Sequence, residues 1–216
     1  MREAFHKELE AIDQEIVAMG AVVERSTQDA TRALIECDRA LAQKVREGDD
    51  EIDRMFLDIE KRSLTLLAQQ APVAGDLRLI VAILRVVNDL ERVGDLAYNI
   101  AKLVQLEDFC EPGPKALHAL VADLGQAAGH LIGKAIDAWA AKDETLAADL
   151  AREDDRIDEL HAQLIHRLLE LNDQASVGPA IRLAMVGRYF ERIGDHAVNM
   201  GERVRYFVTG DEEHLG

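Results

Sequence analysis

Apolar residues recur along this chain every three to four positions, the period of amphipathic helices, and no segment alternates like a half-buried strand. The period breaks where proline or glycine occurs, at Pro72 and Gly75, at Pro112 and Pro114, and at Pro179. We therefore expect an all-α fold with short turns. The expected helices cover residues of about 3–36, 38–70, 76–106, 115–141, 143–172 and 179–208, with Asp38 and Asp143 as N-caps.

The helical pattern occurs twice. Residues 89–99 recur as 189–199 with a constant offset of 100, and residues 38–53 recur as 143–158 with an offset of 105. A fixed self-similarity of this kind predicts repeated structural units. We expect two tandem three-helix bundles related by an internal repeat, one over residues 1–110 and one over residues 115–210, with residues 111–114 as the linker.

Each repeat carries two pairs of carboxylates four residues apart, so both members of a pair lie on one helix face. The pairs are Asp49 and Asp53, Glu91 and Asp95, Asp154 and Asp158, and Glu191 and Asp195. The same faces are apolar, since Leu77, Leu84 and Val87 lie within roughly 40° of Glu91 on a helical wheel. Like charges at this spacing repel. Removing each carboxylate from water costs on the order of several kcal/mol, unless a bound proton or cation neutralises its charge.

Two such helices facing each other would bring four carboxylates to one site in each half, which predicts bound metal. Oxygen ligands favour magnesium, manganese, calcium or iron. Zinc is a further candidate, the ion would be divalent or ferric, and four carboxylates could bridge more than one ion. The alternative is that each pair is a solvated acidic face at a rim, with Arg92 or Arg192 as its partner.

Two glycines and two asparagines near the acidic pairs could affect metal binding. Gly94 and Gly194 lie between the two acids of their pairs, where close helix approach or room for an ion would offset the helical cost of glycine. Asn99 and Asn199 lie one turn beyond, and bonding to a nearby backbone group is the favoured interpretation over metal ligation.

Two histidines near the repeated acids of the second half have no histidine counterpart in the first half. His161 lies close to the Asp154 face and could add a ligand, although a core or rim histidine is the favoured interpretation. His196 stands where the first half has Leu96, and we expect it to point away from the carboxylates.

The net charge of −16 over 216 residues argues against nucleic-acid binding, because no basic patch is visible. Excess acid suits metal cations or a basic protein partner, or serves solubility alone. The two cysteines, Cys37 and Cys110, form no CxxC motif, which suggests a reduced, cytosolic protein. No run of about 18 apolar residues and no signal-peptide core is present, so we expect a cytoplasmic chain without membrane insertion.

Together, the four acidic pairs, their repeat and the Pro-Val-Ala-Gly-Asp-Leu-Arg turn at 72–78 make the chain resemble the PhoU family of phosphate-signalling regulators. The resemblance implies two three-helix bundles, each with a carboxylate metal cluster. It implies a cytoplasmic negative regulator of phosphate uptake and of the phosphate-starvation response. It also implies an adaptor between two partners, the ATPase subunit of the phosphate ABC transporter and a sensor histidine kinase. The second half lacks the Asp-Leu-Arg turn, so any role of Asp76 and Arg78 would belong to the first half.

Other functions are less well supported by the sequence. No nucleotide-binding loop or nucleophile constellation is present, so we do not expect an enzyme. The alternatives are a metal storage or buffering protein and a di-metal enzyme, but ferritin-like enzymes use Glu-x-x-His pairs and only His161 could join here. The apolar arc formed by Val86, Val93, Ala97 and Ile100 could form a homodimer interface or be covered within the chain.

Overall fold

The computed structural model describes residues 2–70, 72–106, 115–171, 177–211 and 213. The helices it contains are α1 (Arg2–Glu36), α2 (Arg39–Gln70), α3 (Ala74–Val104), α4 (Lys115–Ala141), α5 (Glu144–Leu169) and α6 (Val177–Thr209). No strand occurs in these ranges, and the all-α prediction is confirmed. Helix α5 ends at Leu169, three residues before the expected end at 172. The expected linker at 111–114 lies outside the described residues.

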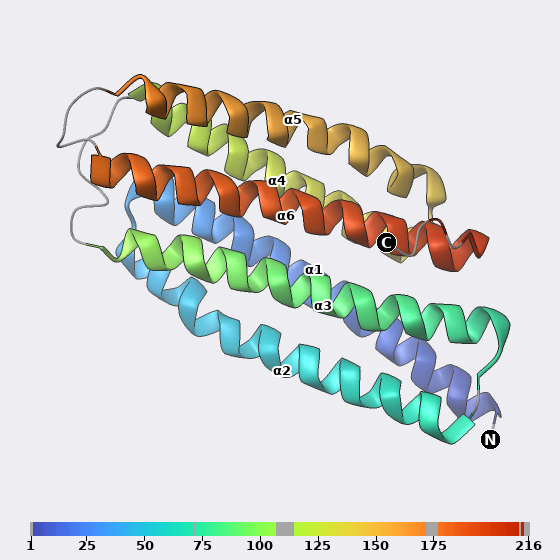
Figure 1. The fold of residues 1–216 in the computed structure, drawn as a ribbon. Helices are drawn as coiled ribbons and strands as arrows, with labels where there is room; N and C mark the ends of the chain where they lie inside the picture. Colours follow the sequence, from blue (N-terminus) through green and yellow to red (C-terminus); the bar gives the residue numbers. More distant parts are fainter. Residues whose placement is uncertain (1, 71, 107–114, 172–176, 212, 214–216) are drawn as a thin grey trace.

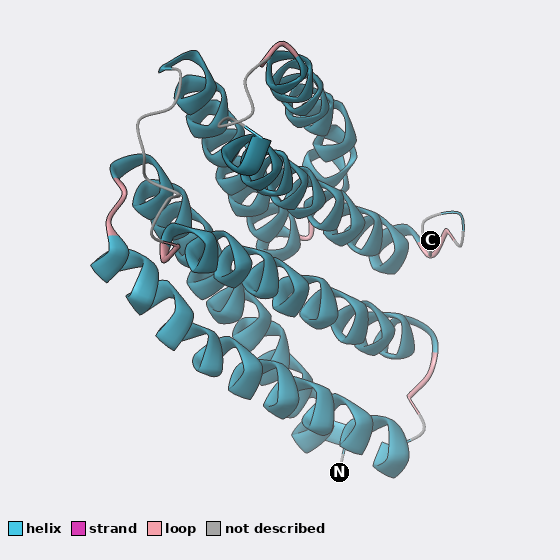
Figure 2. Ribbon diagram, turned by 60° about the vertical axis from the view of Figure 1, so that its left-hand side comes forward, coloured by secondary structure: helices cyan, strands magenta, loops and turns pink. Residues whose placement is uncertain are grey.

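The helices pack as two three-helix bundles that are joined through two pairs of helices. Helices α1, α2 and α3 contact one another, as do α4, α5 and α6. Between the halves α1 packs on α4 and α3 packs on α6. Figure 1 shows α3 and α6 side by side in the centre, flanked by α2 and α5, and Figure 2 shows the same layers from another side. The predicted repeat is therefore visible as two copies of one helical unit.

The two bundles share one continuous core. Trp139 and Phe190, which are among the largest fully buried side chains, belong to the same apolar cluster as the buried residues of the first half. The arc of α3 formed by Val86, Val93, Ala97 and Ile100 is fully buried in this cluster. The arc is thus covered within the chain and offers no surface for a second copy.

The turn that precedes α2 and the turn that precedes α5 have the same backbone conformation and the same type of helix cap. Cys37 and Lys142, which differ by the repeat offset of 105, both have left-handed backbones with φ of 55° and 54°. The next residue then caps the following helix, since Asp38 Oδ1 accepts from Leu41 N at 2.9 Å and Asp143 Oδ1 accepts from Thr145 N at 2.8 Å. Both predicted N-caps are confirmed.

Glycines let α1 and α4 approach closely and in a symmetric way. A methyl group on Gly20 would lie 2.7 Å from Ile136 Cγ1, and one on Gly125 would lie 2.6 Å from Thr31 Oγ1. The offset of 105 relates Gly20 to Gly125 and Thr31 to Ile136, so the two contacts are equivalent. The halves are therefore related by an approximate two-fold axis that passes between α1 and α4.

Two observations bear on the cellular setting expected from the sequence. Cys37 is disulfide-bonded, so the expectation of reduced cysteines is wrong for this residue. Cys110 lies outside the described residues. Within the described ranges, no helix has both the length and the apolar character needed to cross a bilayer.

Candidate metal centres

In the first half, α2 and α3 bring the two predicted carboxylate pairs close enough to influence one another. Burial raises the pKa of Asp49 to about 6, and the negative charges of Asp53, Asp95 and Glu91 add to the rise. The pKa of Glu91 is also raised, first by burial and then by Asp95. All four carboxylates therefore share one electrostatic environment.

The second half repeats this arrangement on α5 and α6. Burial raises the pKa of Asp154 to about 7, with further contributions from Asp158, Asp195 and Glu191. The pKa of Glu191 is raised by burial and by Asp195. The two halves thus hold equivalent sites, each with an inner aspartate whose pKa is raised.

Each site has an inner and an outer layer. Asp49 and Glu91 in the first half, like Asp154 and Glu191 in the second, are partly buried. Their partners four residues further along are more open, and Asp53, Asp158 and Asp195 are exposed. A cation entering from solvent would meet the outer carboxylates first and the inner ones last.

Arginines partly compensate the inner glutamates. Arg92 Nη1 lies 3.3 Å from Asp95 Oδ2, and Arg92 Nε lies 3.5 Å from Glu91 Oε2. In the second half the ion pair to Glu191 comes from Arg188, not from the expected Arg192. Arg92 is about half exposed, with 52% of its side chain accessible, so solvent screens this compensation.

Two inner carboxylate oxygens of the second site have no hydrogen-bond donor. Asp154 Oδ1 and Glu191 Oε2 are buried and unpaired within the part of the chain that the structure describes. An unpaired buried acceptor costs about 1–3 kcal/mol, and more when it is charged. A bound cation would remove this cost, so the donor set fits a hard metal ion.

The four carboxylates of each site are nevertheless not close enough together to coordinate one ion. In the described ranges no group of three or more His, Cys, Asp or Glu side chains is arranged closely enough to hold a metal ion. Loading would therefore require side-chain rotations that draw the outer carboxylates inward. The exposed positions of Asp53, Asp158 and Asp195 leave room for such rotations.

The glycine between the two acids of each pair lets the facing helix approach closely, which is one of the two roles predicted for it. A methyl group on Gly94 would lie 3.1 Å from two carbon atoms of Ile52 and 3.5 Å from Asp49 Oδ1. A methyl group on Gly194 would overlap Asp154 Oδ1 and lie 3.0 Å from Ile157 Cδ1. In the second site the inner aspartate thus occupies space that glycine leaves empty on the facing helix, whereas in the first site it is the side chain of Ile52 that lies tightly against the glycine.

The neighbouring polar residues have separate roles. Asn99 Nδ2 donates to Asp95 O at 2.8 Å, which confirms backbone bonding for this residue. His161 is partly exposed beside Gly187, and its charge opposes the rise in the Glu191 pKa. It therefore lies at the rim of the second site, as the favoured interpretation expected.

His196 lies in the interface between α3 and α6, where its Nδ1 is 2.9 Å from Asp89 Oδ1. This confirms that it points away from its own site. Asp89 was not singled out from the sequence, although it is only 6% exposed. Its signal was a charged residue within the apolar pattern of α3, and its partner follows only from the packing of α3 on α6.

Comparison with known proteins identifies the family. The PhoU domain matches residues 16–104 and 121–204, one copy in each half. The chain is 39% identical to the phosphate-specific transport system accessory protein PhoU homolog of Pseudomonas putida, over 99% of this chain and 84% of that protein. It is 32% identical to PhoU homolog 2 of Mycobacterium tuberculosis, over 97% of this chain and 99% of that protein.

Two crystal structures share the fold. PhoU from Pseudomonas aeruginosa superimposes with a TM-score of 0.88 at 36% identity, covering 96% of this chain and 100% of that one. The phosphate transport system regulatory protein PhoU from Streptococcus pneumoniae gives 0.85 at 28% identity, covering 96% and 98%. With both halves matched and full-length relatives above 30% identity, this chain belongs to the PhoU family.

Proposed function

We propose that this protein is a metal-binding regulator of phosphate transport that acts through protein contacts and not through catalysis. Its relatives are named as accessory proteins of a phosphate-specific transport system and as a phosphate transport regulatory protein. The observation that carries the metal part is the pair of equivalent four-carboxylate sites, the second of which has two inner oxygens without a hydrogen-bond donor.

The metal ligands are proposed to be the eight repeated acids. Asp49, Asp53, Glu91 and Asp95 would hold one site, and Asp154, Asp158, Glu191 and Asp195 the other. A bound cation would neutralise their mutual repulsion and tie α2 to α3 and α5 to α6. Iron, manganese, magnesium, calcium or zinc fits a carboxylate set of this kind, singly or as a cluster.

The regulatory action is proposed to be negative, lowering phosphate uptake and the phosphate-starvation response when phosphate is plentiful. The proposed partners are the ATPase subunit of the phosphate ABC transporter and a sensor histidine kinase, at the cytoplasmic face of the membrane. The net charge of −16 favours basic or mixed-charge partner surfaces and an association that weakens with salt.

A second candidate function is metal storage or buffering, or di-metal catalysis. The gathering of four carboxylates at each site favours it. Against it, His161 lies at the rim of the second site, and His196, whose charge opposes the rise in the Glu91 pKa, is bonded to Asp89. Oxygen consumption or iron turnover by the purified protein would support this candidate.

The regulator proposal is tested by deletion and complementation in the source cell, with a phosphate-responsive reporter gene. We expect derepression at high phosphate in the deletion strain and rescue by the wild-type gene. The purified protein should retain the transporter ATPase or a sensor kinase from membranes at low salt and release it at high salt. Normal phosphate control in the deletion strain, with neither partner retained, would leave metal buffering as the better account.

A further inference from the structure

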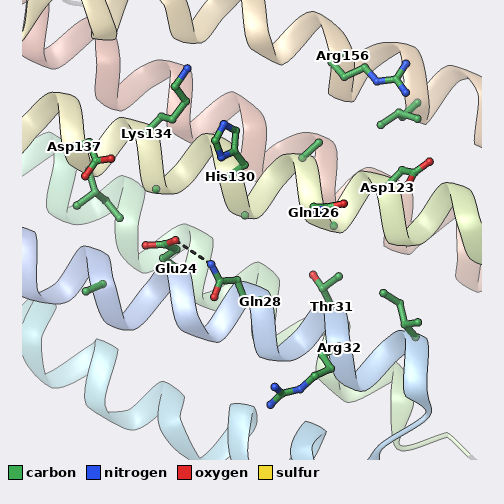
Figure 3. Close-up of a pocket in the computed structure, with 18 of the residues that line it drawn as sticks. Glu24, Gln28, Thr31, Arg32, Asp123, Gln126, His130, Lys134, Asp137 and Arg156 are labelled. Atoms are coloured by element: carbon green, nitrogen blue, oxygen red, sulfur yellow. Dashed lines mark hydrogen bonds between the residues drawn. The ribbon is translucent and has the colours of Figure 1, made fainter.

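A long groove runs along the contact between α1 and α4, and none of the eight candidate metal ligands lines it. It has a volume of about 1120 Å³ and extends from Val17 to Glu36 on α1. Figure 3 shows side chains of α1 and α4 along its two sides, with Arg156 contributed from α5. The groove is therefore a surface feature distinct from the candidate metal centres.

Glycines one turn apart on α4 line the groove. Contacts within the chain explain why some of these positions need a glycine, but not all of them. Gly125 is required, because a methyl group there would meet Thr31 and lie 2.9 Å from Phe190 Cζ. Gly129 is not required, because its nearest neighbour would be Gln28 Cγ at 3.5 Å, an ordinary contact. Glycine inside a helix costs about 1 kcal/mol relative to alanine. An occupant that approaches the α4 backbone closely would account for Gly129.

The basic side chains of the groove are already neutralised. Arg32 pairs with Asp29 at 2.9 Å, Lys134 pairs with Glu153, and Arg156 pairs with Glu159 at 3.5 Å. These three pairing acids do not line the groove.

By contrast, the lining acids have no basic partner among the residues that the structure describes, and one of them accepts a hydrogen bond from Gln28 instead; these acids are Glu24, Glu36, Asp123 and Asp137. The uncompensated charge of the groove is therefore negative.

Two of the uncompensated acids, Asp123 and Asp137, mark the ends of the groove, and Glu24 lies between them beside Gln28. Asp123 and Asp137 are 14 residues apart on α4, about 21 Å at 1.5 Å per residue. Figure 3 shows them toward opposite ends, with Gln28 and His130 between them. Small residues such as Ala21 and Gly129 line the stretch between the two acids. An occupant with basic groups about four helical turns apart would match this spacing.

We propose that the groove between α1 and α4 binds an α-helix of a partner protein that carries Lys or Arg about four turns apart, with small and apolar residues between them. Helices bind in grooves through side chains that recur on one face, and the basic ends fix the register. The inference does not depend on metal loading. Failure of metal binding and failure of this docking site are therefore separate results.

The test uses the full-length protein and synthetic helical peptides of about 20 residues, in fluorescence anisotropy at physiological salt. The first peptide has Lys near both ends of an Ala- and Leu-rich face. The second has Glu at these positions, and the third has the same Lys residues moved to the centre. We expect the first to bind, with and without chelator, and the other two to bind at least tenfold more weakly.

Two variants locate the binding. Gln126→Trp places a bulky side chain in the groove, and Gln69→Trp on α2 is the matched control. Asp123→Asn with Asp137→Asn removes the end charges, and Glu10→Gln with Glu47→Gln removes the same charge elsewhere. We expect about tenfold weaker binding for the groove variants alone. Equal effects of groove and control variants, or equal binding of the three peptides, would overturn the proposal.

Discussion

Gly94 and Gly194 occupy equivalent positions, yet substitution by alanine should affect the two candidate metal centres differently. A methyl group on Gly94 meets Ile52, whose terminal carbon can shift, and leaves Asp49 Oδ1 at 3.5 Å. A methyl group on Gly194 overlaps Asp154 Oδ1 and forces this side chain to rotate. Neither glycine supplies a ligand atom from a side chain, so the variants test the geometry of the inner aspartate alone.

The expected change in folding free energy is small for both variants. Alanine gains about 1 kcal/mol over glycine inside a helix, and overpacking costs about 1–3 kcal/mol. In Gly194→Ala the Asp154 carboxylate can turn toward water, because its buried oxygen has no donor to lose. We therefore expect the metal-free variants to unfold in urea within about 1–2 kcal/mol of the wild type.

The expected change in metal affinity is large for one variant. Loss of an interaction that orients a ligand typically weakens metal binding about 10–100-fold, and displacement of the ligand itself should cost at least as much. In titration calorimetry with Mn²⁺, Gly194→Ala should lose the second site and retain the first. Gly94→Ala should retain both. Equal weakening by the two substitutions, or full occupancy in Gly194→Ala, would refute the placement of Asp154 as an inner ligand.

Three further predictions concern stability. The metal-free protein should lose stability as pH rises from about 4 to about 7, because the pKa of Asp154 is raised from 3.8 to about 7 and the folded state binds this proton more tightly than the unfolded state. Urea unfolding at a series of pH values should show this fall in the free energy of unfolding for the wild type and a smaller fall for Asp154→Asn. Chelation at neutral pH should lower the melting temperature by several degrees, because a ligand present at a concentration 100 times its Kd stabilises the folded state by about 2.7 kcal/mol. In a variant with all eight acids neutralised, calorimetry should show no effect of the chelator on the melting temperature. His196→Leu should cost about 1–3 kcal/mol in urea unfolding, because the buried Asp89 loses its hydrogen bond to His196, and an unchanged free energy of unfolding would contradict this role.

The local features of the fold could be read from the sequence because their causes are local. Apolar periodicity predicted the helices, and Asp38 and Asp143 predicted where α2 and α5 begin. The end of α5 was placed three residues too late, since no proline or glycine marks Leu169 as its last residue. The carboxylate pairs and the glycines between them were found because their spacing and repetition are visible in the chain.

Features that depend on how distant helices meet were missed. The contact between Asp89 and His196 requires the register of α3 on α6, which no local pattern encodes. The choice of Arg188 over Arg192 as the partner of Glu191 depends on side-chain rotation around α6. The shared core also depends on how α1 packs on α4 and α3 on α6, which the repeat of the sequence does not encode.

The most direct test of the account is the metal content of the purified protein after reconstitution and removal of free ions. Elemental analysis should find metal in the wild type and about half as much in Glu91→Gln with Asp95→Asn. The equivalent pair, Glu191→Gln with Asp195→Asn, should also retain about half, and the combined variant should retain none. Absence of metal from the wild type, or an unchanged metal content in the combined variant, would contradict the assignment of these carboxylates as ligands.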